Sequence, residues 1–195
     1  MLVYRVFPYD DSAAAGKPGH PDYLHKPQGK GRVDNPRDYD SWYYAQSPEA
    51  AVGEVFGDIT EWGDDMFEIP ALPGAYRALG TFELPDDLSI LDLDDAQNLL
   101  HRGLRPTQVI ARNRATSQAW SLRIFQEADH FGDRKWSGVR WWSFQRPQWP
   151  VMCLWNESTQ DPSHSLVDVE LLYIGHPVIA DAARTLGKVL PKVSP

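Results

Sequence analysis

Residues 41–56 read Ser-Trp-Tyr-Tyr-Ala-Gln-Ser-Pro-Glu-Ala-Ala-Val-Gly-Glu-Val-Phe. The residues from Ser41 to Ala45 predict a short strand, because aromatic side chains suit a pleated surface. Ser47 is a good helix N-cap, and Pro48 suits the first helical position, where an N–H group would have no partner. The segment therefore predicts a strand that turns directly into a helix, which ends near Gly57.

The remaining sequence predicts strands and helices in irregular order. Apolar runs predict strands, and apolar residues at helical spacing predict helices. The expected strands span residues 2–7, 79–84, 88–93, 136–144, 151–155 and 166–174, and the expected helices span residues 94–102, 116–128 and 177–190. This order is typical of the α+β class. A length of 195 residues fits one domain, so we expect residues 1–195 to form a single domain.

Composition and charge exclude several classes of function. The formal net charge is -8, whereas non-specific nucleic-acid binding needs a basic surface. No apolar run approaches the roughly 20 residues of a membrane span, and the first residues lack the pattern of a signal peptide. Cys153 is the single cysteine, which fits a reducing cytoplasm. The histidines show no metal-binding spacing, so we expect no metal site. The negative charge and the lack of a long apolar run lead us to expect no direct contact with nucleic acid or membrane.

Residues 10–40 predict a long loop that is rich in Gly, Pro, Asp and Lys. A loop of this length inside a domain is either disordered or functional, and we expect a mobile flap over a site. Near its end lies Gly29-Lys30-Gly31-Arg32. Glycine lets the backbone approach a ligand, and Arg32 can form bidentate hydrogen bonds to phosphate oxygens. The spacing is not that of a Walker A loop, and a solvated basic loop explains the same residues.

Three further residues are candidates for a site. Glu54 lies among small and apolar residues of the expected helix, where a ligand could approach it; a solvent-facing carboxylate is the alternative. The ring of Tyr43 suits stacking on a flat ligand, and it suits a core position equally well. Ser143 ends an aromatic strand outside a Gly-x-Ser-x-Gly elbow, which is weak evidence for a nucleophile. It could instead orient a ligand or a carboxylate by hydrogen bonding.

Four motifs together resemble the pattern of the RES-domain family, which is named for its Arg, Glu and Ser. They are Tyr4-Arg5, then Gly31-Arg32, then Tyr43-Tyr44-Ala45-Gln46-Ser47-Pro48 with Glu54, and finally Gly138-Val139-Arg140-Trp141-Trp142-Ser143. The third motif is the most specific, and the four span most of the chain.

The chain departs from the family pattern at two places. The family usually has an aromatic residue and then Asn after its motif Arg, whereas Arg32 is followed by Val33-Asp34-Asn35, which is one residue longer. Arg5 and Arg37 therefore remain alternatives to Arg32. The residue before the motif Ser is often Pro and is Trp142 here, which could narrow the pocket.

The resemblance implies a fold, an activity and a partner. The fold would have a mixed β-sheet core with peripheral helices, similar to the ADP-ribosyltransferase fold. The activity would be cleavage of the nicotinamide–ribose bond of NAD, with water or inorganic phosphate as the acceptor. Most characterised members are toxins whose partner is an Xre-type helix-turn-helix antitoxin. The resemblance does not decide whether the chain forms a homodimer.

The resemblance also implies a role for each motif residue. Glu54 would stabilise the positive charge that develops on the ribose and would hold its 2′-hydroxyl. Arg32 would hold the pyrophosphate, with Arg5 as a helper. Tyr43 would stack on the nicotinamide, and Ser143 would position the nicotinamide or Glu54.

Two other functions stay open on the sequence alone. The same site could transfer ADP-ribose to a protein. Alternatively, the chain could be a non-enzymatic nucleotide- or sugar-binding module, because five of its eight Trp lie between Trp136 and Trp155 and could form a stacking platform. Burial of these Trp in core strands explains the cluster more simply.

Overall fold

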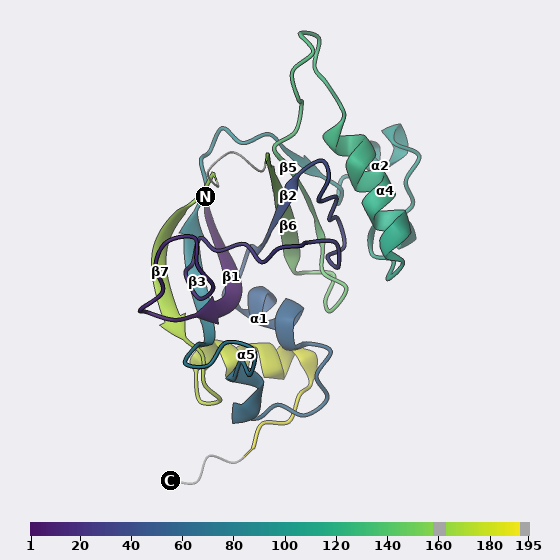
Figure 1. Cartoon of the computed structure of the whole chain (residues 1–195). Helices are drawn as coiled ribbons and strands as arrows, with labels where there is room; N and C mark the ends of the chain where they lie inside the picture. The colour runs from purple at the N-terminus through teal and green to yellow at the C-terminus, as the bar shows by residue number, and fades with distance from the viewer. Residues whose placement is uncertain (158–162, 192–195) are drawn as a thin grey trace. The chain divides into compact units, whose positions relative to one another are not determined.

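The computed structural model describes residues 1–157 and 163–191 (Figure 1). The strands are β1 Leu2–Tyr9, β2 Asp40–Ala45, β3 Tyr76–Glu83, β4 Ile90–Asp92, β5 Gly138–Trp142, β6 Pro150–Asn156 and β7 Ser165–Leu171. The helices are α1 Pro48–Phe56, α2 Ala96–His101, α3 Pro106–Val109, α4 Arg114–Phe125 and α5 Pro177–Leu186, with a 3-10 turn η1 at Asp64–Phe67. The expected α+β class is confirmed, and the strand pairing is mixed because β4 runs parallel to β5 while β6 runs antiparallel to it.

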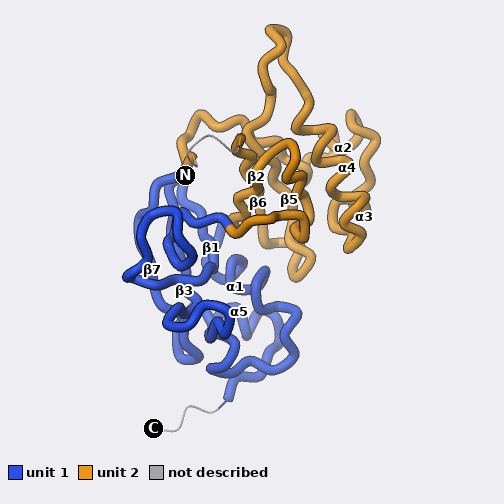
Figure 2. The backbone as a smooth tube through the Cα atoms, viewed as in Figure 1, with its two compact units in different colours: residues 1–24, 45–83, 164–195 blue, residues 25–44, 84–163 orange. Residues whose placement is uncertain are grey.

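The chain folds as two compact units (Figure 2). Unit 1 comprises residues 1–24, 45–83 and 164–195, and unit 2 comprises residues 25–44 and 84–163. The chain therefore passes from one unit to the other several times. The expectation of a single domain over residues 1–195 stays a prediction.

Unit 1 contains the antiparallel strands β1, β3 and β7, paired in that order. Ala45, the last residue of β2, pairs with Tyr4 of β1. Helix α1 begins as the sequence predicts, because the Ser47 hydroxyl accepts a hydrogen bond from the Ala50 N–H at 3.3 Å. The helix packs against β1 and lies beside α5 (Figure 1). Its buried face consists of Ala50, Ala51, Val52, Gly53 and Phe56.

Unit 2 contains strands in the order β4-β5-β6-β2. Its core includes three aromatic rings that pack against one another. The Tyr39 ring centroid lies 4.6 Å from that of Phe125 and 5.4 Å from that of Trp155. Trp141, Trp149 and Trp155 are buried, so much of the Trp-rich segment serves the core, as the simpler explanation of the cluster expects.

Two helix boundaries differ from the expected ones, and one short helix is additional, each for a local reason. Helix α4 starts at Arg114 because the Asn113 side chain accepts a hydrogen bond from the Thr116 N–H at 3.3 Å. Helix α5 ends at Leu186 because Gly187 adopts a left-handed φ of 70°. The short helix α3 was not expected; it begins at Pro106, where proline suits the first turn.

None of the helices among residues 1–157 and 163–191 is long and apolar enough to span a membrane.

Gly138 determines how closely β5 approaches β6. It lies opposite Leu154 in the antiparallel pair. A Cβ atom at this position would collide with the Cys153 carbonyl oxygen and would lie 3.1 Å from the Leu154 Cα. Because both obstacles are backbone atoms of a buried strand, they cannot move aside at low cost. The close approach of β5 to β6 thus explains why the last motif, which ends at Ser143, begins with a glycine.

We predict that Gly138→Ala lowers the free energy of unfolding by about 1–3 kcal/mol, the usual cost of overpacking a buried site. Urea titration followed by Trp fluorescence measures the change. Ser165→Ala, at an exposed strand position, is the control and should leave the free energy nearly unchanged. Equal free energies of unfolding for Gly138→Ala and the wild-type protein would show that β5 and β6 accommodate a Cβ atom at no cost, which would contradict the steric role of Gly138.

Candidate functional site

A buried carboxylate holds the glycine-rich segment in unit 2. Asp34 is only 5% exposed. Its Oδ2 atom accepts hydrogen bonds from the Gly29 N–H at 2.8 Å and the Gly31 N–H at 2.7 Å. Its Oδ1 atom accepts a hydrogen bond from the Tyr43 hydroxyl at 2.6 Å. Hydrogen bonds to an ionised group are stronger than neutral ones, so the three together hold the backbone on either side of Lys30.

The Tyr43 hydroxyl connects strand β2 to the same segment. Besides donating to Asp34, it accepts a hydrogen bond from the Val33 N–H at 3.0 Å. Burial raises the pKa of Tyr43 well above its usual value, and the nearby Cys153 and Asp34 raise it further. The hydroxyl therefore stays protonated and remains a donor at physiological pH. The Tyr43 ring meets Trp141 edge-on, with the centroids 6.5 Å apart.

Gly31 is required by this arrangement. A Cβ atom on Gly31 would collide with the Asp34 carboxylate and with the Tyr43 hydroxyl. Neither group can move without losing the hydrogen bonds described above. The glycine at position 31 therefore has a steric reason, which is the close packing of polar groups around Asp34.

Helix α4 holds the other side of the segment. The Gln118 amide donates to the carbonyl oxygens of Gly29 and Gly31, each at 3.0 Å, and Arg114 Nε donates to the Lys30 carbonyl at 2.9 Å. The Ser117 hydroxyl donates to the Arg32 carbonyl at 2.5 Å. Residues 29–34 are thus held by polar contacts and by the buried Val33 side chain, in contrast to the mobile flap that the sequence predicts.

Arg32 lies at the end of this anchored segment. Its Nη1 atom donates to the carbonyl oxygens of Val109 at 3.2 Å and Ala111 at 2.5 Å. Val109 is the last residue of the short helix α3 and Ala111 follows it, and carbonyls at a helix C-terminus lack partners within the helix. The two contacts orient the guanidinium group. The alternative candidate Arg37 lies in the same loop and is exposed.

Ser143 follows β5 directly and is 1% exposed. Its N–H donates to the Trp149 carbonyl at 2.8 Å, and its hydroxyl oxygen accepts from the Gln145 N–H at 2.9 Å. The residue thus shapes the turn between β5 and β6. This geometry agrees with a positioning role better than with that of an activated nucleophile.

Glu54 and Arg5 belong to unit 1. Glu54 lies on α1 outside its buried face and is exposed, as the solvent-facing alternative expects. Arg5 lies on β1 opposite Gly80 and is half-buried, with its guanidinium carbon 5.8 Å from the centre of the Phe7 ring. The structure thus brings Arg32 and Tyr43 into one hydrogen-bonded segment of unit 2, and it places Glu54 and Arg5 on neighbouring elements of unit 1.

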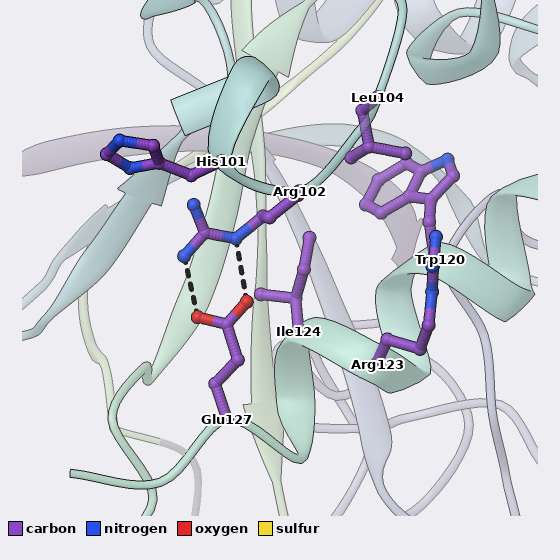
Figure 3. A pocket seen from close by; sticks show the side chains of 7 residues that line it. All are labelled: His101, Arg102, Leu104, Trp120, Arg123, Ile124 and Glu127. Carbon is purple, nitrogen blue, oxygen red and sulfur yellow. Dashed lines mark hydrogen bonds and ion pairs between the residues drawn. The ribbon is translucent and has the colours of Figure 1, made fainter. Parts of the chain in front are cut away.

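A separate pocket opens in unit 2 (Figure 3). It is lined by His101, Arg102, Leu104, Trp120, Arg123, Ile124 and Glu127. None of the expected site residues lies in this lining. No group of His, Cys, Asp or Glu side chains suited to a metal ion occurs in the part of the chain that the structure describes.

A model of the RES domain matches residues 2–173. The chain belongs to the RES-domain family. A search of curated proteins gives no match. Among solved structures, the chain is similar to a chain in the crystal structure of the M. tuberculosis MbcT-MbcA toxin-antitoxin complex. The two share 17% sequence identity and a TM-score of 0.59, with 96% of this chain and 89% of that chain covered. At this identity the likeness shows a shared fold.

Family membership confirms the resemblance that the four motifs indicate. The sequence did not reveal Asp34, Gln118 and Ser117, which hold the Arg32 segment. Asp34 appeared only as part of a departure from the family spacing. Its one available signal was the position of a carboxylate three residues after a glycine, where it can accept backbone N–H groups of a turn.

We predict that Asp34→Asn loosens residues 29–33, because an amide offers one acceptor oxygen and turns an NH₂ group toward other donors. The loss should be about 1–3 kcal/mol in unfolding free energy. Faster hydrogen exchange of the Gly29 and Gly31 amides is the direct readout. Asp38→Asn, at an exposed carboxylate in the same loop, is the matched control. Unchanged exchange at both glycines in Asp34→Asn would contradict the anchoring role.

Proposed function

We propose that this RES-domain chain cleaves the nicotinamide–ribose bond of NAD, with water or inorganic phosphate as the acceptor, and acts as the toxin of a bacterial toxin–antitoxin pair. The observation that carries the proposal is the anchored Arg32–Tyr43 segment in a chain of this family. The segment carries a cation and glycine backbone, and the hydroxyl of the half-buried Tyr43 ring is hydrogen-bonded to it. Such groups suit the recognition of a phosphate-bearing, ring-containing molecule.

The chemistry needs a carboxylate near the ribose. Nicotinamide leaves NAD as a neutral molecule when the bond from its ring nitrogen to ribose C1′ breaks, and positive charge develops on the ribose. An anionic group stabilises that oxocarbenium-like state, so Glu54 is proposed for this role. Water would then give ADP-ribose and a proton. Inorganic phosphate would instead give ADP-ribose that carries the phosphate on the same C1′ carbon.

Recognition of the rest of NAD is proposed for the other motif residues. Arg32 would hold the pyrophosphate, since its guanidinium is oriented by two backbone carbonyls. Arg5 would assist. The Tyr43 ring would stack on nicotinamide, and its hydroxyl would keep the ring angle through Asp34. Ser143 would position the nicotinamide or Glu54. The proposal requires no metal ion.

The partner and the cellular setting belong to the same proposal. The M. tuberculosis structure with a similar fold is that of a toxin-antitoxin complex. By analogy, an antitoxin protein would bind this chain, and an Xre-type helix-turn-helix protein is the proposed kind. We propose that the chain works in the cytoplasm and forms a single domain over residues 1–195. Whether two copies form a homodimer is left open.

Nicotinamide release from NAD by the purified chain tests the activity. We predict release by the wild-type protein and a loss of about 10²-fold or more in kcat for Glu54→Gln, as for other single electrostatic catalysts. Release in phosphate compared with phosphate-free buffer separates phosphorolysis from hydrolysis. Glu49→Gln, on the same helix, is the matched control and should retain activity. Full activity of Glu54→Gln would contradict the assignment of this carboxylate.

A second comparison identifies the phosphate-binding arginine. We predict that Arg32→Ala raises KM for NAD by about tenfold or more, the effect of losing a charge-assisted contact, with a smaller effect on kcat. Arg37→Ala should leave KM unchanged. Melting temperatures show whether each variant folds, because Arg32 also contacts Val109 and Ala111. A raised KM in Arg37→Ala or Arg5→Ala, with an unchanged KM in Arg32→Ala, would move the role to that residue.

A further inference from the structure

The pocket in unit 2 has a rigid apolar wall. Leu104, Trp120 and Ile124 line it and are nearly fully buried. The Trp120 indole N–H donates to the Gln108 carbonyl at 3.2 Å, which holds the ring in place. Packed side chains of this kind form a preformed surface for a small apolar group.

An ion pair forms the second wall. Arg102 donates from Nε and Nη2 to the two carboxylate oxygens of Glu127, at 2.7 and 2.6 Å, and from Nη1 to the Asn98 carbonyl at 3.1 Å. The Trp136 indole N–H also donates to Glu127, at 2.7 Å. Although burial opposes it, these contacts hold the pKa of Glu127 below its usual value. The carboxylate therefore stays ionised, and its charge is already matched by Arg102.

Two further side chains on the rim of the pocket have no ion-pair partner of this kind among the described residues. Arg123 and His101 are exposed, and neither side chain makes a hydrogen bond or ion pair within residues 1–157 and 163–191. In Figure 3, Arg123 and His101 lie on opposite sides of the Arg102–Glu127 pair. The lining contains two Arg and one Glu, so one positive charge of the lining is not matched by a carboxylate of the lining. The local charge therefore favours an anion.

We propose that this pocket binds a small organic oxyanion, in which a carboxylate or phosphate is attached to a single apolar ring. The ring would contact Leu104, Trp120 and Ile124, and the oxyanion would contact Arg123, with His101 on the facing rim. The proposal does not depend on the NAD-cleaving activity, and no residue assigned to NAD lines the pocket.

The size of the pocket limits the ligand. Its volume is about 220 Å³. Sites for drug-sized ligands measure about 300–1,000 Å³, so a dinucleotide does not fit, whereas one ring with one anionic group does. The apolar wall adds contact area that inorganic phosphate alone cannot use, and the uncompensated charge on the rim disfavours a cationic analogue of the same ring.

Titration of the ¹⁵N-labelled protein tests the proposal. The probes are benzoate, phenyl phosphate, inorganic phosphate and benzylamine at constant ionic strength, and the readouts are the Trp120 indole N–H and the backbone amides of Leu104 and Ile124. We expect saturable shifts with benzoate or phenyl phosphate, weaker ones with inorganic phosphate, and none with benzylamine. The tighter of the two ring anions identifies whether a carboxylate or a phosphate is preferred.

Variants on the rim separate specific binding from a general charge effect. Arg123→Gln should weaken binding of the preferred anion about tenfold, the effect of one lost charge-assisted contact. Arg105→Gln is the control, because Arg105 is exposed, follows Leu104 in the chain and lies outside the lining. Both side chains are at the surface, so both variants should fold. Equal affinity in the two variants, or equal shifts with benzylamine and benzoate, would overturn the proposal.

Discussion

The Asp34 carboxylate is the interaction on which the candidate site depends. It is buried, and it accepts hydrogen bonds from two glycine N–H groups and from the Tyr43 hydroxyl. A buried carboxylate without such donors would be costly, so the loop and the carboxylate stabilise each other. Because a side chain at Gly31 would occupy the space of these groups, the glycine and the carboxylate must occur together. Arg32 is held between this cluster and the carbonyls at the C-terminus of α3.

An anchored segment suits ligand binding better than a mobile one. Ordering a loop during binding costs free energy, and a loop that is already held by hydrogen bonds avoids much of that cost. The hydrogen bonds that Gln118 and Ser117 donate and Asp34 accepts meet this requirement, together with the buried Val33 side chain. Tyr43 has two functions in this view. Its hydroxyl completes the cluster, and its ring is the surface proposed for nicotinamide.

The local features of the fold could be predicted from the sequence, and the long-range polar contacts could not. Ser47 and Pro48 mark the start of α1 by chemistry that acts within one helical turn, and the structure places them there. The anchoring of residues 29–34 depends on Gln118 and Ser117, more than 80 residues away, and no periodic pattern connects such partners. A loop with few aliphatic residues therefore predicted mobility, whereas hydrogen bonds and the buried Val33 side chain hold residues 29–34. The ion pair of Arg102 and Glu127, which lines the pocket in unit 2, joins residues 25 apart and was hidden for the same reason.

The central claim is that the segment held by Asp34 binds NAD, and an NMR titration tests it most directly. NAD is added to the ¹⁵N-labelled Glu54→Gln protein, in which slow turnover keeps the ligand intact. The account predicts saturable shifts in the amides of residues 29–35 and of Tyr43, and a much weaker response in the double variant Asp34→Asn, Glu54→Gln. Saturable NAD binding that leaves the amides of residues 29–35 and Tyr43 unshifted would contradict it.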